Sequence, residues 1–244
     1  MTSDWDKSAE AWLTWLDHHG DWNREHIVDH AMLRCIEGRH IRSALDVGCG
    51  EGRFCRILKA RNIQTAGVDP TAALIQEAVR RDTAGRYVIG RGEHLPFASA
   101  SFDLVVSYLS LIAIADFRAA VHEMARVLRP GSPLVIANLT SFTSPCSDKG
   151  WIIGRNGRQL YYPLDRYLDE FPVSVSWADV RVENWHRPLR SYMNVLLDAG
   201  LELRGFDEPE PLASEPESER AALYRRVPWF IVMDWRKPNP LPHS

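Results

Sequence analysis

The 244-residue sequence has few cysteines and no long apolar run, and its charge is close to balanced. Its four cysteines form no C-x-x-C pair and have no histidine at the spacing of a zinc site. This usage is typical of reduced thiols in an intracellular protein, and it predicts neither a disulfide framework nor a metal site. No stretch of 18 apolar residues occurs, and no apolar signal segment follows Met1, so we expect a cytoplasmic protein that is not bound to a membrane.

Basic residues are not in excess either. Lys and Arg number 29 against 32 Asp and Glu, which gives a formal net charge of −3. Much of the acidity lies in one Pro-rich stretch, 207–220, where six carboxylates face one arginine. A nucleic-acid binder that relies on bulk positive charge is therefore not expected. The aromatic content is the unusual feature, with nine tryptophans, none of them between Trp22 and Trp151.

Short apolar runs alternate with amphipathic stretches along most of the chain. We expect strands at 43–47, 64–69, 86–89, 102–107, 133–139, 201–206 and 229–235. Helices are expected within 1–40 and at 53–60, 71–81, 117–128 and 189–199. The order β-α-β-α predicts an α/β fold, a doubly wound sheet with helices on both faces.

Five segments follow from this pattern. A helical N-terminal cover at 1–40 precedes a core at 41–140, and an insert rich in Trp, Tyr, Pro and Gly at 141–188 shows weak periodicity. Residues 189–236 complete the sheet, and a Pro-rich tail at 237–244 is expected to fray.

A glycine-rich turn connects the first strand to the first helix. Gly48, Gly50 and Gly52 make a G-x-G-x-G pattern, which permits a sharp bend and a close approach of backbone to a ligand. Asp69 lies at the end of the second strand, 17 residues beyond Gly52 and near the offset at which a carboxylate meets a ribose diol. A tight loop without a ligand is the alternative for the turn alone, but the combination favours a nucleoside site.

With these residues the chain resembles the class I S-adenosylmethionine-dependent methyltransferases, in particular the ubiquinone/menaquinone-type group of small-molecule enzymes. The motifs that carry the resemblance are LDVGCGEG (45–52), GVDP (67–70), EHLPF (93–97), SFDLVVS (101–107) and EMARVLRPG (123–131). The resemblance implies a Rossmann-like seven-stranded sheet whose last strand is antiparallel and lies between the fifth and sixth. It also implies S-adenosyl-L-methionine as cofactor and S-adenosyl-L-homocysteine as product.

The resemblance also implies which residues bind the cofactor. Asp46 would lie near the methionine amine, Asp69 would bind the ribose hydroxyls, and Arg24 is a candidate for the methionine carboxylate or else a surface arginine. The remaining candidates for cofactor binding are Trp12, Gly48, Cys49, Gly50, Pro70, Gly92, Glu93, His94, Ser107 and Tyr108. Many relatives carry an aspartate where this chain has Arg91, so the contact with the adenine amine would pass to Glu93 or to a backbone carbonyl.

Two residues are candidates for catalysis. His186 precedes the helix that follows the insert, where it would act as a general base or would only orient that helix. Tyr192, one turn on, and Asn138, at the exit of the fifth strand, are further pocket candidates. Rings of the insert would line the acceptor pocket or would only pack a subdomain core.

We therefore expect methyl transfer to O, N or C of a small, planar or aromatic metabolite, by a monomer or homodimer. Two alternatives stay open. A nucleic-acid methyltransferase is disfavoured because residues 107–113 lack the Pro-Pro-Tyr type of sequence that holds a flipped base. A non-catalytic regulatory protein that binds the cofactor would have the same fold and motifs.

Overall fold

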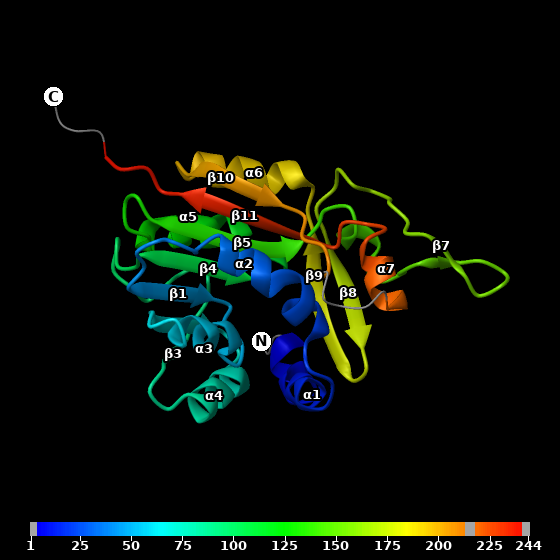
Figure 1. Ribbon diagram of the computed structural model, residues 1–244, viewed down its shortest axis with the longest axis horizontal. Coiled ribbons are helices and arrows are strands. Elements are labelled where there is room, and N and C mark those ends of the chain that lie inside the picture. The colour runs from blue at the N-terminus through cyan, green and yellow to red at the C-terminus, as the bar shows by residue number, and fades with distance from the viewer. Residues whose placement is uncertain (1–3, 213–217, 241–244) are drawn as a thin grey trace.

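A seven-stranded sheet forms the centre of the molecule in the computed structural model, which describes residues 4–212 and 218–240 (Figure 1). The strands are, in spatial order, β10 (Glu202–Asp207), β11 (Phe230–Arg236), β5 (Pro133–Leu139), β4 (Leu104–Tyr108), β1 (Ser43–Val47), β2 (Gln64–Asp69) and β3 (Arg86–Ile89). β11 runs antiparallel to both of its neighbours, β5 and β10. The predicted fold class and the place of the last strand are confirmed.

Side chains of the central strands are buried on both faces of the sheet. In β5, Leu134 and Ile136 pack in one apolar cluster, whereas Val135 and Ala137 pack in a second cluster on the opposite face. Successive side chains of a strand point to opposite faces, so a continuous apolar run is what a doubly covered strand requires. This pattern is what made the core strands readable from sequence.

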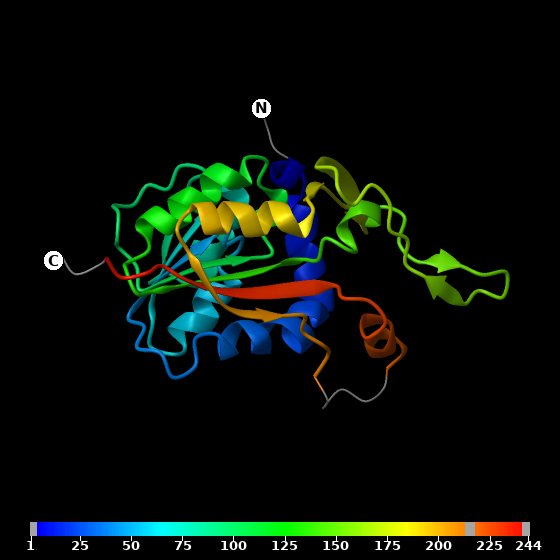
Figure 2. The same cartoon turned by 90° about the horizontal axis from the view of Figure 1, so that it is seen from above.

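The helices cover both faces of the sheet (Figure 2). Figure 2 shows α5 and α6 on one face and α2 and α3 on the other. The helical segments are α1 (Asp4–His19), η1 (Arg24–Val28), α2 (Asp29–Arg34), α3 (Arg53–Lys59), α4 (Ala72–Arg81), η2 (Leu111–Ala113), α5 (Phe117–Val127), η3 (Ser144–Cys146), α6 (Leu189–Asp198) and α7 (Glu219–Tyr224). No helix among the described residues has the length and apolar character needed to cross a bilayer.

The insert after β5 is more regular than its sequence suggested. It contains two antiparallel hairpins, β6 (Ile152–Ile153) with β7 (Gln159–Tyr161) and β8 (Phe171–Trp177) with β9 (Val180–His186). The β6–β7 hairpin extends away from the body of the molecule in Figures 1 and 2. Many of the hairpin side chains stay exposed, so the apolar periodicity that marks a core strand is weak here.

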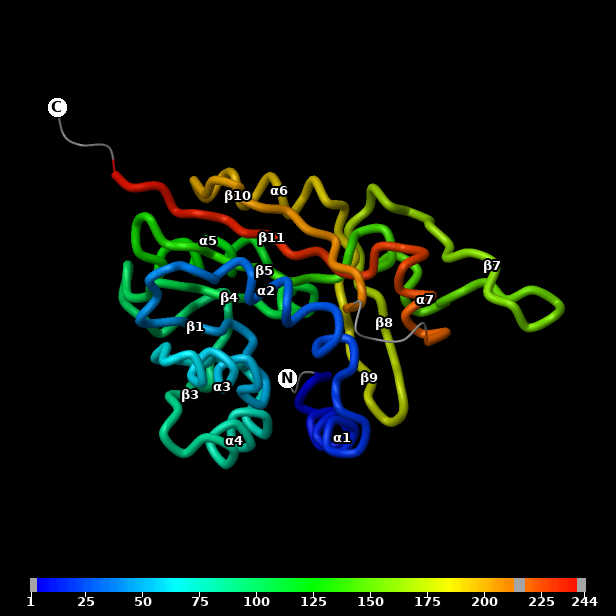
Figure 3. The backbone as a smooth tube through the Cα atoms, viewed as in Figure 1, coloured from blue at the N-terminus to red at the C-terminus, as the bar shows by residue number. Residues whose placement is uncertain are grey.

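Helix α1 lies alongside the β8–β9 hairpin, although about 160 residues separate the two elements (Figure 3). Within the C-terminal region, residues 213–217 of the acidic stretch and 241–244 of the tail are outside the described residues. The expectation that the tail frays from Lys237 is wrong at its first residue. The Lys237 ammonium donates hydrogen bonds to the carbonyl oxygens of Ala125 and Leu128, at 2.7 and 2.9 Å.

Candidate functional site

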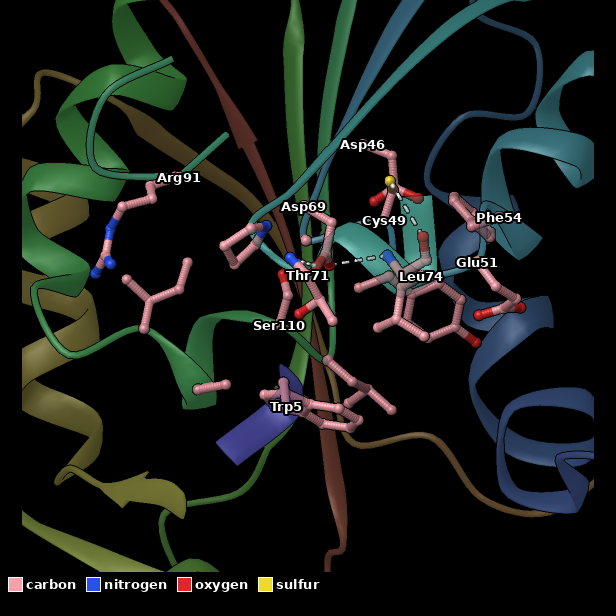
Figure 4. Close-up of a pocket in the computed structure, with 18 of the residues that line it drawn as sticks. Trp5, Asp46, Cys49, Glu51, Phe54, Asp69, Thr71, Leu74, Arg91 and Ser110 are labelled. Atoms are coloured by element: carbon pink, nitrogen blue, oxygen red, sulfur yellow. Dashed lines mark hydrogen bonds between the residues drawn. The ribbon is translucent and has the colours of Figure 1, made fainter. Parts of the chain in front are cut away.

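A pocket opens at the carboxyl ends of β1, β2 and β4, with α1 beside its mouth (Figure 4). Parallel sheets bind ligands at this edge, where the connections to the helices diverge. Eleven of the thirteen predicted cofactor residues line the pocket, namely Trp12, Arg24, Asp46, Gly48, Cys49, Gly50, Asp69, Pro70, Gly92, Glu93 and Tyr108. The fold thus brings together residues from three of the quoted motifs, at 45–52, 67–70 and 93–97, with Trp12 and Arg24 from the N-terminal helical segment.

The turn after β1 requires glycine. Gly48, Gly50 and Gly52 all have positive φ angles, of 77°, 54° and 76°. A Cβ atom on Gly48 would also lie 2.3 Å from the Cβ of Ser110, which is closer than two carbon atoms can approach. The turn therefore exposes backbone to the pocket without a side chain between.

The carboxylate of Asp69 is held by two backbone N–H groups. Gly50 donates to one oxygen at 3.0 Å and Thr71 donates to the other at 2.8 Å. Asp69 is the last residue of β2 and is nearly buried, and this burial raises the pKa of its carboxyl group. The two N–H donors aim the carboxylate into the pocket, where it can accept hydrogen bonds from a diol.

Asp46 presents a buried carboxylate that has too few partners. Its Oδ1 atom is buried and has no hydrogen-bond partner, and its Oδ2 atom lies 3.7 Å from the Sγ atom of Cys55. Burial raises the pKa of this carboxyl group to about 7. An unpaired buried carboxylate is costly, so the site calls for a cation at this position.

Arg24 lies between two aromatic rings. Its guanidinium carbon is 5.6 Å from the centre of the Trp12 ring and 5.5 Å from that of Tyr108, within the range of cation–π attraction. Its Nε atom forms an ion pair with Asp21 at 3.2 Å. The two rings and the ion pair with Asp21 hold the Arg24 guanidinium at the pocket wall. In this position it can pair with an anionic group of a ligand.

Behind Tyr108 is a polar network that the sequence did not reveal. Its hydroxyl donates to Asp29 at 2.7 Å, and Arg53 donates to the same carboxylate through two nitrogens at 2.9 and 2.6 Å. Asp29 belongs to α2, which the sequence marks only as part of an amphipathic stretch. The network fixes the Tyr108 ring and Arg53, both of which line the pocket.

Twelve further residues line the pocket but were not among the predicted cofactor residues. They are Trp5, Glu51, Arg53, Phe54, Thr71, Leu74, Arg91, Leu109, Ser110, Ala113, Ile114 and Ala115. A signal existed for some of them, because Arg53 and Phe54 follow the glycine turn directly and Thr71 follows Pro70. The apolar residues after β4 carry no such signal, since small and aliphatic side chains occur in any buried connection.

The Arg91–Glu93 segment lies where the resemblance described above implies an aspartate at position 91. Arg91 donates to Glu93 at 2.9 Å, and the Arg91 side chain is 71% exposed. Figure 4 shows this side chain at the rim, away from Asp46 and Asp69. A Cβ atom on Gly92 would meet Ile114 at 3.0 Å, so the backbone runs close to the loop after β4.

Two predicted cofactor residues do not line the pocket. His94 is exposed, and Ser107 is fully buried behind Ser110, with their hydroxyl oxygens 2.8 Å apart. Ser110 in turn donates to the carbonyl oxygen of Val47 at 2.5 Å. Ser107 therefore supports the wall of the pocket through Ser110.

The two candidate catalytic residues also lie outside the pocket lining. His186 is fully buried, and both ring nitrogens are engaged: Nδ1 is 2.8 Å from the Ser144 hydroxyl and Nε2 is 3.0 Å from the Tyr167 carbonyl oxygen. A carbonyl only accepts, so Nε2 carries the proton and Nδ1 accepts from Ser144. Burial lowers the pKa of His186, which keeps the ring neutral.

Tyr192 is buried on the face of the sheet that α5 and α6 cover. Its ring packs against Phe117, edge to face, with centres 5.2 Å apart. Burial raises the pKa of its hydroxyl group. The third pocket candidate, Asn138, is fully buried in β5 and is likewise absent from the lining.

Part of the chain is similar to known proteins. Residues 45–136 match a family described as "Methyltransferase domain". A malonyl-[acyl-carrier protein] O-methyltransferase of Salmonella typhimurium is 32% identical over 128 residues, which make up 52% of this chain and 51% of that protein. The chain thus spans about half the length of these curated relatives.

Solved structures extend the likeness to the whole fold. An S-adenosylmethionine-dependent methyltransferase of Mesorhizobium loti has a TM-score of 0.75 and 26% identity, over 85% of this chain and 96% of that one. A protein of Listeria monocytogenes has a TM-score of 0.78 at 21% identity, over 86% of this chain and 96% of its own, a likeness that shows the fold.

Proposed function

We propose that the chain is a class I S-adenosylmethionine-dependent methyltransferase that transfers a methyl group to an oxygen atom of a small acceptor. The observation that carries the proposal is the unpartnered, buried carboxylate oxygen of Asp46 beside the glycine turn. A site that buries a carboxylate without a cation is incomplete by itself, because burial of an unpaired charge is unfavourable.

The pocket residues fit the cofactor. Asp46 would pair with the ammonium group of its methionine part, and Arg24 would pair with the carboxylate of the same part. Asp69 would accept from both ribose hydroxyls, since two backbone N–H groups already hold its carboxylate in place. These three side chains match the cationic, anionic and diol groups of one molecule.

The protein contributes orientation and exclusion of water. When bound, S-adenosylmethionine supplies a methyl group on a positively charged sulfur, which makes that group reactive toward nucleophiles. Trp5 and Trp12 from α1 line the pocket, and their rings meet edge to face with centres 6.1 Å apart. Alignment of two reactants in a closed site can lower a barrier by about 7–11 kcal/mol, which leaves little need for further chemical assistance.

None of the described residues that line the pocket is a histidine or a lysine. The Tyr108 hydroxyl donates a hydrogen bond to Asp29, and Asp69 and Glu93 already accept hydrogen bonds. Glu51 forms an ion pair with Arg56 at 3.7 Å, and Asp46 would be paired with the ammonium group of the bound cofactor. We therefore propose an acceptor whose oxygen is ionised before transfer, such as a carboxylate or an acidic phenol. For His186 to act as a base, its Nδ1 atom would have to give up the hydrogen bond that it accepts from Ser144 inside the insert.

The proposed acceptor is small and planar or partly apolar. The rings of Trp5, Trp12 and Phe54 and the aliphatic side chains of Leu74 and Leu109 support this, since flat apolar surfaces favour such ligands. Transfer to oxygen is supported by the name of the Salmonella relative, an O-methyltransferase.

Calorimetry with S-adenosylhomocysteine tests the cofactor site. We expect Asp69→Ala to weaken binding by about tenfold or more, because it removes a charge-assisted contact to the ribose. Asp198→Ala, which removes an exposed carboxylate at the end of α6, is the matched control and should bind as the wild type does. Equal affinity of Asp69→Ala and wild type would refute the proposed ribose contact.

Methyl transfer is tested with cofactor labelled on the methyl group, incubated with panels of carboxylates, phenols and N-heterocycles. We expect label on an oxygen that is ionised at the assay pH. Label on nitrogen or carbon only, or on RNA, would contradict the proposed acceptor. Binding of the cofactor without transfer to any acceptor or to a cell extract would indicate a regulatory protein instead.

A further inference from the structure

Arg187 is a buried arginine that has no acidic partner. It is 1% exposed and lies between β9 and α6, directly after His186. None of the ion pairs found among the described residues includes it, and the nearby carboxylate of Glu170 pairs with Arg118 instead. A buried guanidinium without a counter-ion is unfavourable unless other groups compensate its charge.

Three carbonyl oxygens of one short loop provide that compensation. Arg187 donates to the carbonyl oxygen of Leu111 at 3.3 Å through Nη1, and to those of Ile114 and Ala115 at 2.6 and 3.0 Å through Nη2. Its guanidinium also lies 4.3 Å from the centre of the Phe117 ring and 5.2 Å from that of Trp185. The planar Arg187 guanidinium thus binds the loop while it also contacts two aromatic rings.

This loop, residues 111–115, forms one wall of the cofactor pocket. Ala113, Ile114 and Ala115 all line the pocket. Ile114 also packs close to Gly92, where an added Cβ atom would lie 3.0 Å from the isoleucine side chain. Any displacement of the loop would therefore change the pocket on the side where the sequence predicts the adenine edge.

His186, the residue before Arg187, forms hydrogen bonds within the insert. His186 binds Ser144 and Tyr167, which both belong to the insert, through its two ring nitrogens. Consecutive side chains therefore bind two different parts of the molecule, the insert and the pocket wall. Neither residue lines the pocket, so both act through the groups that they hold.

We propose that Arg187 is a positioning residue of the methyltransferase site: it holds loop 111–115 in the conformation that binds the cofactor and connects that loop to the insert. The inference rests on the proposed function. Lysine cannot replace it fully, because a single ammonium does not span three carbonyls and stack between two rings as a planar fork does.

Hydrogen–deuterium exchange of the free protein gives a test that does not depend on the acceptor. The amides of Ala113 and Ile114 are hydrogen-bonded within the loop, to Ser110 and Leu111. In Arg187→Met, which keeps length but removes the charge and the donors, we expect these amides to exchange about tenfold faster. Exchange in α6 should stay as in the wild type, whereas a general loss of packing would accelerate it too.

Affinity for S-adenosylhomocysteine, measured by calorimetry, is the second readout. We expect Arg187→Met to weaken binding about tenfold and Arg187→Lys to restore part of the loss. Arg190→Met is the matched control, because this exposed arginine also donates to a carbonyl, that of Leu168 at 3.2 Å, and does not line the pocket. It should match the wild type in both measurements.

The outcomes separate the inference from the function on which it rests. Wild-type exchange and wild-type affinity in Arg187→Met, or in Arg187→Lys if the methionine variant does not fold, would overturn the positioning role. Failure of the wild type itself to bind S-adenosylhomocysteine would overturn the proposed function. Faster exchange at residues 111–115 in Arg187→Met would then still show that Arg187 holds the loop.

Discussion

Ser8 and Arg181, 173 residues apart in the sequence, exchange two hydrogen bonds. The hydroxyl of Ser8 donates to the carbonyl oxygen of Arg181 at 2.7 Å and accepts from its backbone N–H at 3.1 Å. Four residues further along α1, Trp12 meets Trp177 edge to face, with ring centres 5.9 Å apart. These contacts join α1 to the β8–β9 hairpin and place its tryptophans at the pocket.

Removal of the Ser8 hydroxyl should loosen this cover. We expect Ser8→Ala to weaken affinity for S-adenosylhomocysteine several-fold, because each lost hydrogen bond is worth about 1 kcal/mol and the backbone of Arg181 loses its partner. Stopped-flow fluorescence should show the change mainly as faster dissociation. Thr14→Ala, at an exposed position of the same helix, is the control. Identical dissociation rates for both variants would show that the pair does not hold the cover closed.

Cofactor affinity should depend on pH through Asp46. Burial raises the pKa of this carboxyl group to about 7, so the free protein holds it protonated at lower pH. Only the ionised form pairs with the cofactor ammonium, and affinity should therefore rise as the pH increases from 6 to 8 and then level off. Calorimetry across this range checks the expectation. Asp46→Asn should bind weakly and lose the pH dependence.

The same carboxyl group should affect the stability of the ligand-free protein. Its folded-state pKa lies above its usual value of 3.8, so its contribution is favourable at low pH and is lost as the pH rises toward 7. Asp46→Asn, which stays neutral, should therefore unfold at a higher temperature than the wild type at pH 8. The two proteins should converge near pH 4. If Asp46→Asn melted at a lower temperature than the wild type at pH 8, the buried Asp46 carboxylate would not be the source of the instability.

His186→Ala should act on stability. The change leaves Ser144 and the Tyr167 carbonyl without their partner and opens a cavity, which together cost about 2–4 kcal/mol. Denaturant unfolding would measure this loss, and His122→Ala, at an exposed position of α5, should show none. A variant of unchanged stability whose single-turnover rate falls by about 100-fold would instead support a base role.

The rate of methyl transfer should follow the ionisation of the acceptor. When Asp46 is paired with the ammonium group of bound cofactor, the described pocket lining offers no free base. At saturating cofactor, kcat/KM for the acceptor should therefore rise with pH up to the pKa of the acceptor oxygen and then level off. For a series of phenols of different acidity the inflection should move with the phenol. An inflection that stays at one pH for every acceptor would point to a titrating group of the protein.

The core strands, and much of the lining of the candidate cofactor pocket, could be predicted from sequence because each has a local cause. β5 is a continuous apolar run since both of its faces are covered, and Gly48 leaves no space for a side chain beside Ser110. The carboxylate of Asp69 is placed by neighbours within two or nineteen residues of it. Local constraints of this kind leave a recognisable pattern in the sequence.

The rest of the site depends on contacts between distant segments. Tyr108 is fixed by Asp29, 79 residues away, and Arg187 binds a loop more than 70 residues earlier. His186 is placed correctly next to the insert, but its two partners are a serine and a backbone carbonyl that no motif marks. The sequence predicted that His186 either acts as a general base or orients the helix that follows. Only the tertiary structure shows that His186 is buried and that both ring nitrogens form hydrogen bonds inside the insert.

The long separation between α1 and β9 also has a consequence for biosynthesis. Chains are made from the N-terminus, so α1, with Trp5 and Trp12, emerges from the ribosome before β9 and has no β9 to dock against until about 160 further residues have been made. The glycine turn and β1–β5 can fold earlier, because their contacts are closer in sequence. During that interval the nascent core has the strands that form the pocket, but α1 cannot yet dock over it. The exposed Trp5 and Trp12 side chains can then contact chaperones or other chains.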